Sequence, residues 1–90
     1  MDLKFEWDEH KSEANLIKHG ISFPYAISIF YQDFWEQKSA YADEERFVAT
    51  GKVEDEVLTV VYTWRGDVQR IISAGKASQH ERKQYHDLYG

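Results

Sequence analysis

Residues 46–74 read RFVATGK-VEDE-VLTVVYTWR-GD-VQRIISA, a succession of three strand-forming runs separated by two turns. The runs 46–52, 57–65 and 68–74 are rich in Val, Ile, Thr and aromatic residues, which favour a pleated strand. Acidic residues separate the first run from the second, and a Gly-Asp pair separates the second from the third, as in tight hairpin turns. This stretch therefore predicts a three-stranded antiparallel meander.

The segment before the meander begins with helix and strand signals. Phe5-Glu6-Trp7 alternates apolar and acidic residues, which suits a short strand, and Asp8 stands where an N-cap would start a helix. A helix is expected from about residue 9 to residue 18. Gly20 follows it as a C-terminal cap in the left-handed region. The chain thus enters the fold through a short strand and a well-bounded helix.

A second helix is predicted from Ser22, its N-cap, because apolar residues then recur at helical spacing. Phe23, Ala26, Ile27 and Phe30 form this core-facing stripe. Residues 34–38 are interpreted as a possible strand, followed by a polar loop that reaches residue 43.

The chain's last element is predicted from a capping box. Ser78 and Glu81 have the spacing at which each side chain satisfies the other's backbone, so a final helix should run to about Leu88. The predicted fold class is α+β, with a short N-terminal strand, two helices, an antiparallel meander and a C-terminal helix. At 90 residues, one domain covering residues 1–90 is expected.

Composition excludes several classes of protein. The chain has no cysteine, which removes disulfide scaffolds and thiol nucleophiles. No stretch approaches the roughly 20 apolar residues that span a bilayer, so a cytoplasmic protein without membrane contact is expected. The net charge of −5 disfavours nucleic-acid binding by bulk electrostatics, although residues 65–90 carry five Lys/Arg against three Asp/Glu. A local basic face on an acidic body remains possible.

Short phrases along the chain match one known family in order and spacing. The N-terminal phrases are Phe5-Glu6-Trp7-Asp8 with Lys11, then Asn15, Lys18-His19-Gly20, Phe23 and Ala26. The later phrases are Glu45-Arg46, Val61-Tyr62-Thr63 with Arg65, Arg70-Ile71-Ile72-Ser73-Ala74 with Lys76-Ala77, and Glu81-Arg82 with Tyr85. Together they extend over nearly the whole chain, which resembles the BrnT family of toxin-antitoxin proteins.

This resemblance implies a RelE-like fold and an endoribonuclease that cuts RNA and stops translation. It also implies a BrnA-like antitoxin with a ribbon-helix-helix DNA-binding part, and it suggests a heterotetramer as the assembly of toxin and antitoxin. DNA would then be contacted only through the antitoxin complex, which fits the acidic balance of this chain.

Metal-free RNA cleavage uses the ribose 2′-OH as nucleophile, so it needs a base, an acid and cations for the phosphorane. His19 is the titrating candidate, and its alternative role is a cation at the helix end. Glu81 is a candidate base whose capping-box position already has a structural explanation. Tyr85, one turn later, either faces the same surface or packs.

Three arginines on the predicted meander, Arg46, Arg65 and Arg70, are the catalytic candidates for holding a phosphate with guanidinium forks. Arg65 and Arg70 flank a turn, which suggests that they lie across from each other; the alternative is pairing with Glu45 or Asp67. Lys76 precedes the final helix, whose amides also favour an anion. Two further cations, Lys18 and Arg82, are candidates for binding RNA.

One departure from the family pattern concerns the residue after Ser73-Ala74, where an Arg is common and this chain has Gly75. A possible phosphate contact is thereby lost, and with the acidic total this favours an alternative: a non-catalytic interaction module of the same fold. No helix has the dense basic row of a DNA-binding domain. The histidines lack metal-ligand spacing, so neither a metal nor a cofactor is expected.

Overall fold

The computed structural model describes residues 2–41 and 44–90 of the chain. Its elements, in chain order, are β1 (Phe5–Glu6), α1 (Glu9–His19), α2 (Phe23–Ala26), the 3₁₀ helix η1 (Ile27–Tyr31), β2 (Phe34–Tyr41), β3 (Glu44–Val53), β4 (Glu56–Arg65), β5 (Val68–Lys76) and α3 (Gln79–Tyr89). The α+β class and the predicted order of elements are confirmed.

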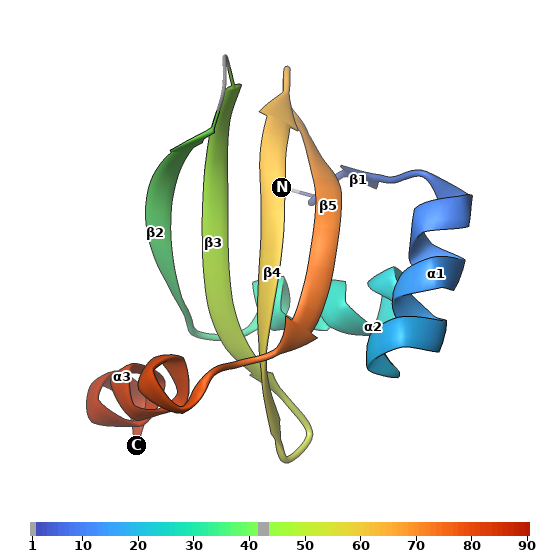
Figure 1. Ribbon diagram of the computed structural model, residues 1–90. Helices are drawn as coiled ribbons and strands as arrows, with labels where there is room; N and C mark the ends of the chain where they lie inside the picture. The colour runs from blue at the N-terminus through green and yellow to red at the C-terminus, as the bar shows by residue number, and fades with distance from the viewer. Residues whose placement is uncertain (1, 42–43) are drawn as a thin grey trace.

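The strands form one five-stranded sheet in the order β1-β5-β4-β3-β2 (Figure 1). Strands β2 to β5 are antiparallel neighbours, while β1 lies parallel to β5, with Phe5 beside Gln69. The predicted three-stranded meander is confirmed as β3, β4 and β5. The antiparallel part of the sheet has one strand more, because β2 pairs with β3 at the edge.

The predicted polar loop after residue 38 is wrong for residues 39–41. These residues continue β2, in which Ser39 pairs with Arg46 and Tyr41 with Glu44. Backbone hydrogen bonds to a neighbouring strand hold polar residues in a sheet without any apolar pattern. Residues 42 and 43, the rest of the predicted loop, lie outside the described residues.

Helix α1 has the predicted caps. The carboxylate of Asp8 accepts hydrogen bonds from the backbone N–H groups of His10, at 2.8 Å, and Lys11, at 3.3 Å. These two donors lower the pKa of Asp8. Gly20 ends the helix with φ of 73°, and its N–H donates to the carbonyl of Leu16. Cap chemistry is local, which is why the sequence predicts both ends.

Asn15 fastens α1 to the sheet. Its Nδ2 donates to the carbonyl oxygen of Ile21 at 2.7 Å and to that of Ala74 at 2.8 Å. The side chain is 8% exposed. Asn15 therefore neither caps the helix nor faces solvent, and its hydrogen bonds hold the helix against β5.

The second predicted helix is shorter than expected. The α-helix covers only four residues, and the chain then tightens into η1. A 3₁₀ helix repeats every three residues, so Phe23, Ala26 and Ile29 fall on one face, and all three are fully buried. The apolar stripe is real, but its C-terminal half follows a period of three.

The two faces of the sheet are covered differently. Helices α1 and α2 with η1 lie on one face, where the main core includes Leu58, Val60 and Ile71. Helix α3 lies against one end of the opposite face (Figure 1), and its Tyr85 packs on Val57 and Ala77. The other end of that face, where β3 begins and β4 ends, is left without a helix.

The capping box of α3 is present and gives a stability prediction. Ser78 Oγ accepts from the N–H of Glu81 at 3.1 Å, and Glu81 Oε1 accepts from the N–H of Ser78 at 2.8 Å. We expect Ser78→Ala to lower the free energy of unfolding by about 1 kcal/mol, because a helix-end donor loses its partner. Urea denaturation measures this, with Gln79→Ala as the exposed control. Equal stability of the two variants would contradict it.

Candidate functional site

Arginines from three strands meet on the open end of the sheet. Arg46 lies near the start of β3, Arg65 ends β4 and Arg70 lies near the start of β5. In the sheet register Thr63 is opposite Arg70, whereas Arg65 is opposite Val68. Arg65 and Arg70 are thus diagonal neighbours on one face, and the expectation that they lie directly across from each other is wrong.

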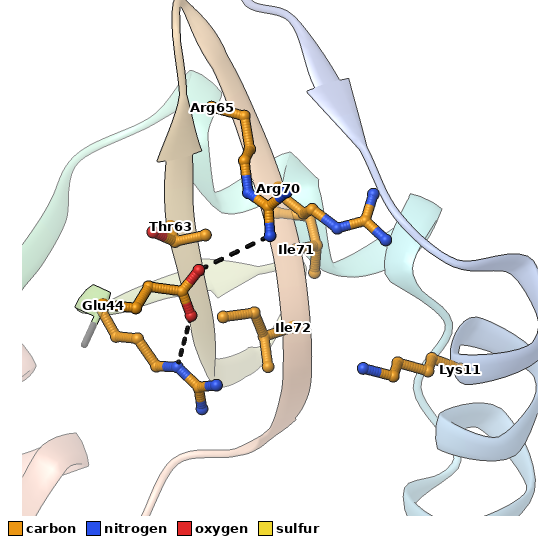
Figure 2. A pocket seen from close by; sticks show the side chains of 8 residues that line it. Lys11, Glu44, Thr63, Arg65, Arg70, Ile71 and Ile72 are labelled. Carbon is orange, nitrogen blue, oxygen red and sulfur yellow. Dashed lines mark hydrogen bonds and ion pairs between the residues drawn. The ribbon is translucent and has the colours of Figure 1, made fainter. Parts of the chain in front are cut away.

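These arginines line a small cavity of about 100 Å³. The cavity is bounded by Lys11, Glu44, Arg46, Thr63, Arg65, Arg70, Ile71 and Ile72. Figure 2 shows Lys11 reaching toward it from α1, while Arg65 extends over it from the end of β4. A helix therefore adds a fourth cation to the three that the sheet supplies.

Carboxylates hold the guanidinium groups in place. Glu44 is within 3.3 Å of Arg46 Nε through Oε2 and within 3.7 Å of Arg65 Nη2 through Oε1. Arg70 Nη1 donates to Glu6 Oε2 at 2.7 Å, which links β5 to β1. The arginines are therefore oriented before any ligand arrives, which lowers the entropic cost of binding.

The partners of these arginines differ from those considered from the sequence. Glu45 is paired with Lys38 at 2.8 Å, and Asp67 with Lys4 at 2.9 Å. Both pairs are largely exposed. Side-chain alternation explains the result for Glu45, because it and Arg46 are adjacent in a strand and point to opposite faces.

Counting charges around the cavity gives a positive excess. Among the residues that the structure describes here, four cations, Lys11 and the three arginines, face two carboxylates, Glu44 and Glu6, a balance of +2 for this described part. The whole chain carries −5. The predicted basic face on an acidic body is therefore found here, in a site that draws on both halves of the sequence.

Two candidates from α1 lie elsewhere. Lys18 and His19 are exposed in the last turn of the helix, and neither lines the arginine cavity. That end of α1 lies toward the opposite end of the sheet (Figure 1). The structure therefore does not bring His19 to the arginines, and a role in catalysis stays a prediction.

The C-terminal candidates form a separate group around α3. Lys76 is near Glu56 at 3.7 Å, and Arg82 Nη1 donates to the carbonyl of Ala77 at 2.9 Å. Glu81 serves the capping box, and Tyr85 is buried. None of the four lines the arginine cavity. Burial raises the pKa of Tyr85.

Gly75 lies near the end of β5, opposite Thr59. A Cβ built there meets no atom within 4 Å, so a larger side chain has room. Arg70, which lines the cavity, lies near the other end of the same strand. An arginine at position 75 would therefore lie away from the cavity, and its absence takes no cation from it.

Sequence reasoning missed Lys11, Glu44 and Thr63 as residues of the site. Lys11 was part of the family phrase that begins at Phe5, and this was the signal that could have singled it out. Glu44 and Thr63 carry no such signal, because their place beside the arginines depends on strand register.

Among the residues that the structure describes, no cluster of three or more His, Asp or Glu side chains is arranged to hold a metal ion. No helix in residues 2–41 and 44–90 is both long and apolar enough to span a bilayer.

Comparison with known proteins identifies the family. No curated protein sequence matches the chain. A family model described as the ribonuclease toxin BrnT of type II toxin-antitoxin systems matches residues 7–81. The matched region runs from the residue after β1 into α3 and contains Lys11, Glu44 and all three arginines of the cavity. The chain belongs to the BrnT family of type II ribonuclease toxins.

Proposed function

We propose that this chain is an endoribonuclease that cuts RNA at the arginine cavity and thereby inhibits translation. The observation that carries the proposal is the convergence of three arginines and Lys11 on one cavity of an acidic protein. Guanidinium forks match the geometry of a phosphodiester, and they gain most when charge builds up in the transition state.

The reaction proposed is a transesterification that needs no metal. The ribose 2′-oxygen attacks the adjacent phosphorus, the bond from phosphorus to the 5′-oxygen breaks, and a 2′,3′-cyclic phosphate is left. Arg65 and Arg70 hold the phosphorane oxygens. Among the described residues that line the cavity, Glu44 is the carboxylate that can take the 2′-OH proton, and Lys11 can donate a proton to the leaving 5′-oxygen.

The antitoxin proposed for this chain is BrnA-like, with a ribbon-helix-helix DNA-binding part. An acidic or apolar segment of it would cover the open end of the sheet, where its carboxylates compete with RNA for the same arginines. The complex, which we propose to be a heterotetramer, would contact DNA through the antitoxin. Neutralisation then requires no change in the toxin fold.

A non-catalytic interaction module is the second candidate function. It is favoured by Glu44 and Glu6, which already pair with the arginines and lower the positive charge that RNA would meet. In that case the cavity would bind an acidic partner and leave RNA intact.

Cleavage of a synthetic RNA in EDTA distinguishes these candidates. The purified chain in EDTA should release a fragment ending in a 2′,3′-cyclic phosphate, and a single 2′-deoxy substitution at the cut site should abolish the cut. A second reaction with added ribosomes replaces EDTA by magnesium, because ribosomes dissociate when magnesium is removed. Mass spectrometry identifies the end group. An intact RNA under both conditions would leave only the interaction module, and a cut that survives the 2′-deoxy substitution would contradict the mechanism.

A further inference from the structure

A second cavity, of about 220 Å³, lies at the same end of the sheet but on the opposite face. Tyr62 and Trp64 line it, and in β4 they alternate with Thr63 and Arg65, which line the arginine cavity. The described residues that line it are Leu3, Phe30, Phe34, Glu36, Tyr62, Trp64 and Gln69. Nothing in the proposed cleavage reaction uses these side chains.

The walls of this aromatic cavity are rings held by one another. The Phe30 ring lies 5.1 Å from that of Phe34 and 5.3 Å from that of Tyr62, in both cases edge to face. Trp64 contacts Tyr62 at 5.8 Å between ring centroids, yet it is 46% exposed. The inner rings are thus fixed by packing, while the outer ring is available to an incoming group.

Glu36 supplies the polar end of the aromatic cavity. It accepts a hydrogen bond from the hydroxyl of Tyr62. Burial and the neighbouring carboxylate raise the pKa of Tyr62, so its hydroxyl stays protonated and acts as the donor. In the described part of the chain no ion pair involves Glu36, and nearby Lys38 is engaged by Glu45 at 2.8 Å.

A carboxylate without a cationic partner, placed beside several aromatic faces, favours a cation over a neutral or anionic group. Rings attract a cation through their quadrupole, and a carboxylate does so through its charge. A guanidinium suits both, because its plane stacks on a ring while its N–H fork meets a carboxylate. Phosphates of an RNA strand would instead be repelled by Glu36 and by Glu45 on the same face.

We propose that the aromatic cavity is a recognition site for an arginine side chain of a partner protein, with Trp64 as the stacking ring and Glu36 as the counter-ion. The family's type II description implies a partner for this chain. Because the two cavities lie on opposite faces of the sheet, a partner bound at both would straddle the exposed end of β4. Recognition of a partner's arginine at the aromatic cavity does not depend on RNA cleavage at the arginine cavity.

The test follows the indole N–H signal of Trp64 by ¹⁵N NMR in the full chain, assigned with Trp64→Phe. The titrant is N-acetyl-arginine methylamide, and the matched neutral compound is the citrulline analogue, which has the same shape without the charge. Guanosine 5′-monophosphate tests for a nucleobase. Glu36→Gln keeps an acceptor for the Tyr62 hydroxyl, and Glu13→Gln removes an exposed carboxylate on α1 as the control.

We expect the arginine compound to move the Trp64 signal saturably, and Glu36→Gln to weaken this binding about tenfold or more. Glu13→Gln should leave it within about twofold, and citrulline should bind at least about tenfold more weakly. The proposal is overturned if no saturable movement occurs up to 100 mM titrant, if citrulline matches arginine, or if Glu36→Gln binds as well as the wild type. Saturable binding of the nucleotide without that of arginine would identify a base-binding site instead. RNA cleavage by Glu36→Gln should equal that of the wild type.

Discussion

Replacing Arg65 and Arg70 together by alanine should reduce RNA cleavage by at least about 10³-fold. Each guanidinium lines the cavity and can contact the developing charge of the phosphorane, and losing one such preorganised donor typically costs about 10²–10³ in rate. The two effects need not multiply, because both arginines act on the same phosphate. The measurement is the single-turnover rate on the synthetic RNA.

The matched control removes the same charge from the other end of the sheet. Lys76→Ala with Arg82→Ala also deletes two cations, and neither residue lines the cavity. This control should retain cleavage within about tenfold. If it loses as much as the arginine pair, bulk charge or a site beside α3 explains the activity, and the arginine cavity is not the centre.

Two single variants refine the assignment within the same assay. Glu44→Gln should slow cleavage about 10²-fold without weakening RNA binding, because it removes a base but adds no repulsion. His19→Ala should leave the rate close to that of the wild type, since His19 does not line the cavity. A large loss with His19→Ala and none with Glu44→Gln would reverse the choice of base.

Gly51→Ala should produce the largest loss of stability from a single methyl group. A Cβ at Gly51 would lie 2.7 Å from Cβ of Ile29 and 3.2 Å from Cβ of Phe34. Both of these atoms are attached directly to backbone, so η1 or β2 must shift away from β3. We expect the free energy of unfolding to fall by about 3 kcal/mol, in the range of overpacked cores.

The matched control is the same substitution at Gly75. There the new methyl group meets nothing within 4 Å, so Gly75→Ala should be neutral or stabilise by about 0.5 kcal/mol through the unfolded state. Thermal unfolding measures both variants, and a 3 kcal/mol loss corresponds to a fall in Tm of roughly 12–24 °C. Equal Tm values would mean that η1 does not press on Gly51.

The burial of the aromatic residues in β4 could not be predicted from the sequence. The strand-forming runs predicted that Tyr62 and Trp64 lie in a strand. They did not predict that Trp64 is half exposed and Tyr62 is buried. Successive residues of a strand point to opposite faces of the sheet. Which of the two faces is buried is decided only when a helix covers one of them. The second cavity forms where Phe30 of η1 meets Tyr62 and Trp64 of β4.

The candidate site was only partly predictable for a similar reason. The sequence placed Arg46, Arg65 and Arg70 on neighbouring strands, and the structure brings them together. It does not bring Glu81 or Tyr85 to them, because α3 covers the far end of the same face. Lys76 is also kept away, because it ends β5 opposite Leu58 on the other face of the sheet. Ile72 has no partner in the register between β4 and β5, and a shift of one residue changes which side chains share a face.

By itself, the sequence determined most of the elements and several of their ends: the Asp8 and Ser78 caps, the Gly20 stop, the hairpin turns and the order of helices and strands. These depend on groups a few residues apart, whose chemistry is already complete in the chain. Only the tertiary structure decided that Asn15 holds α1 to the sheet, that Glu44 pairs with Arg46 and Arg65, and that Lys11 faces them. Those contacts join distant segments, and their existence depends on strand register and on which face each helix covers.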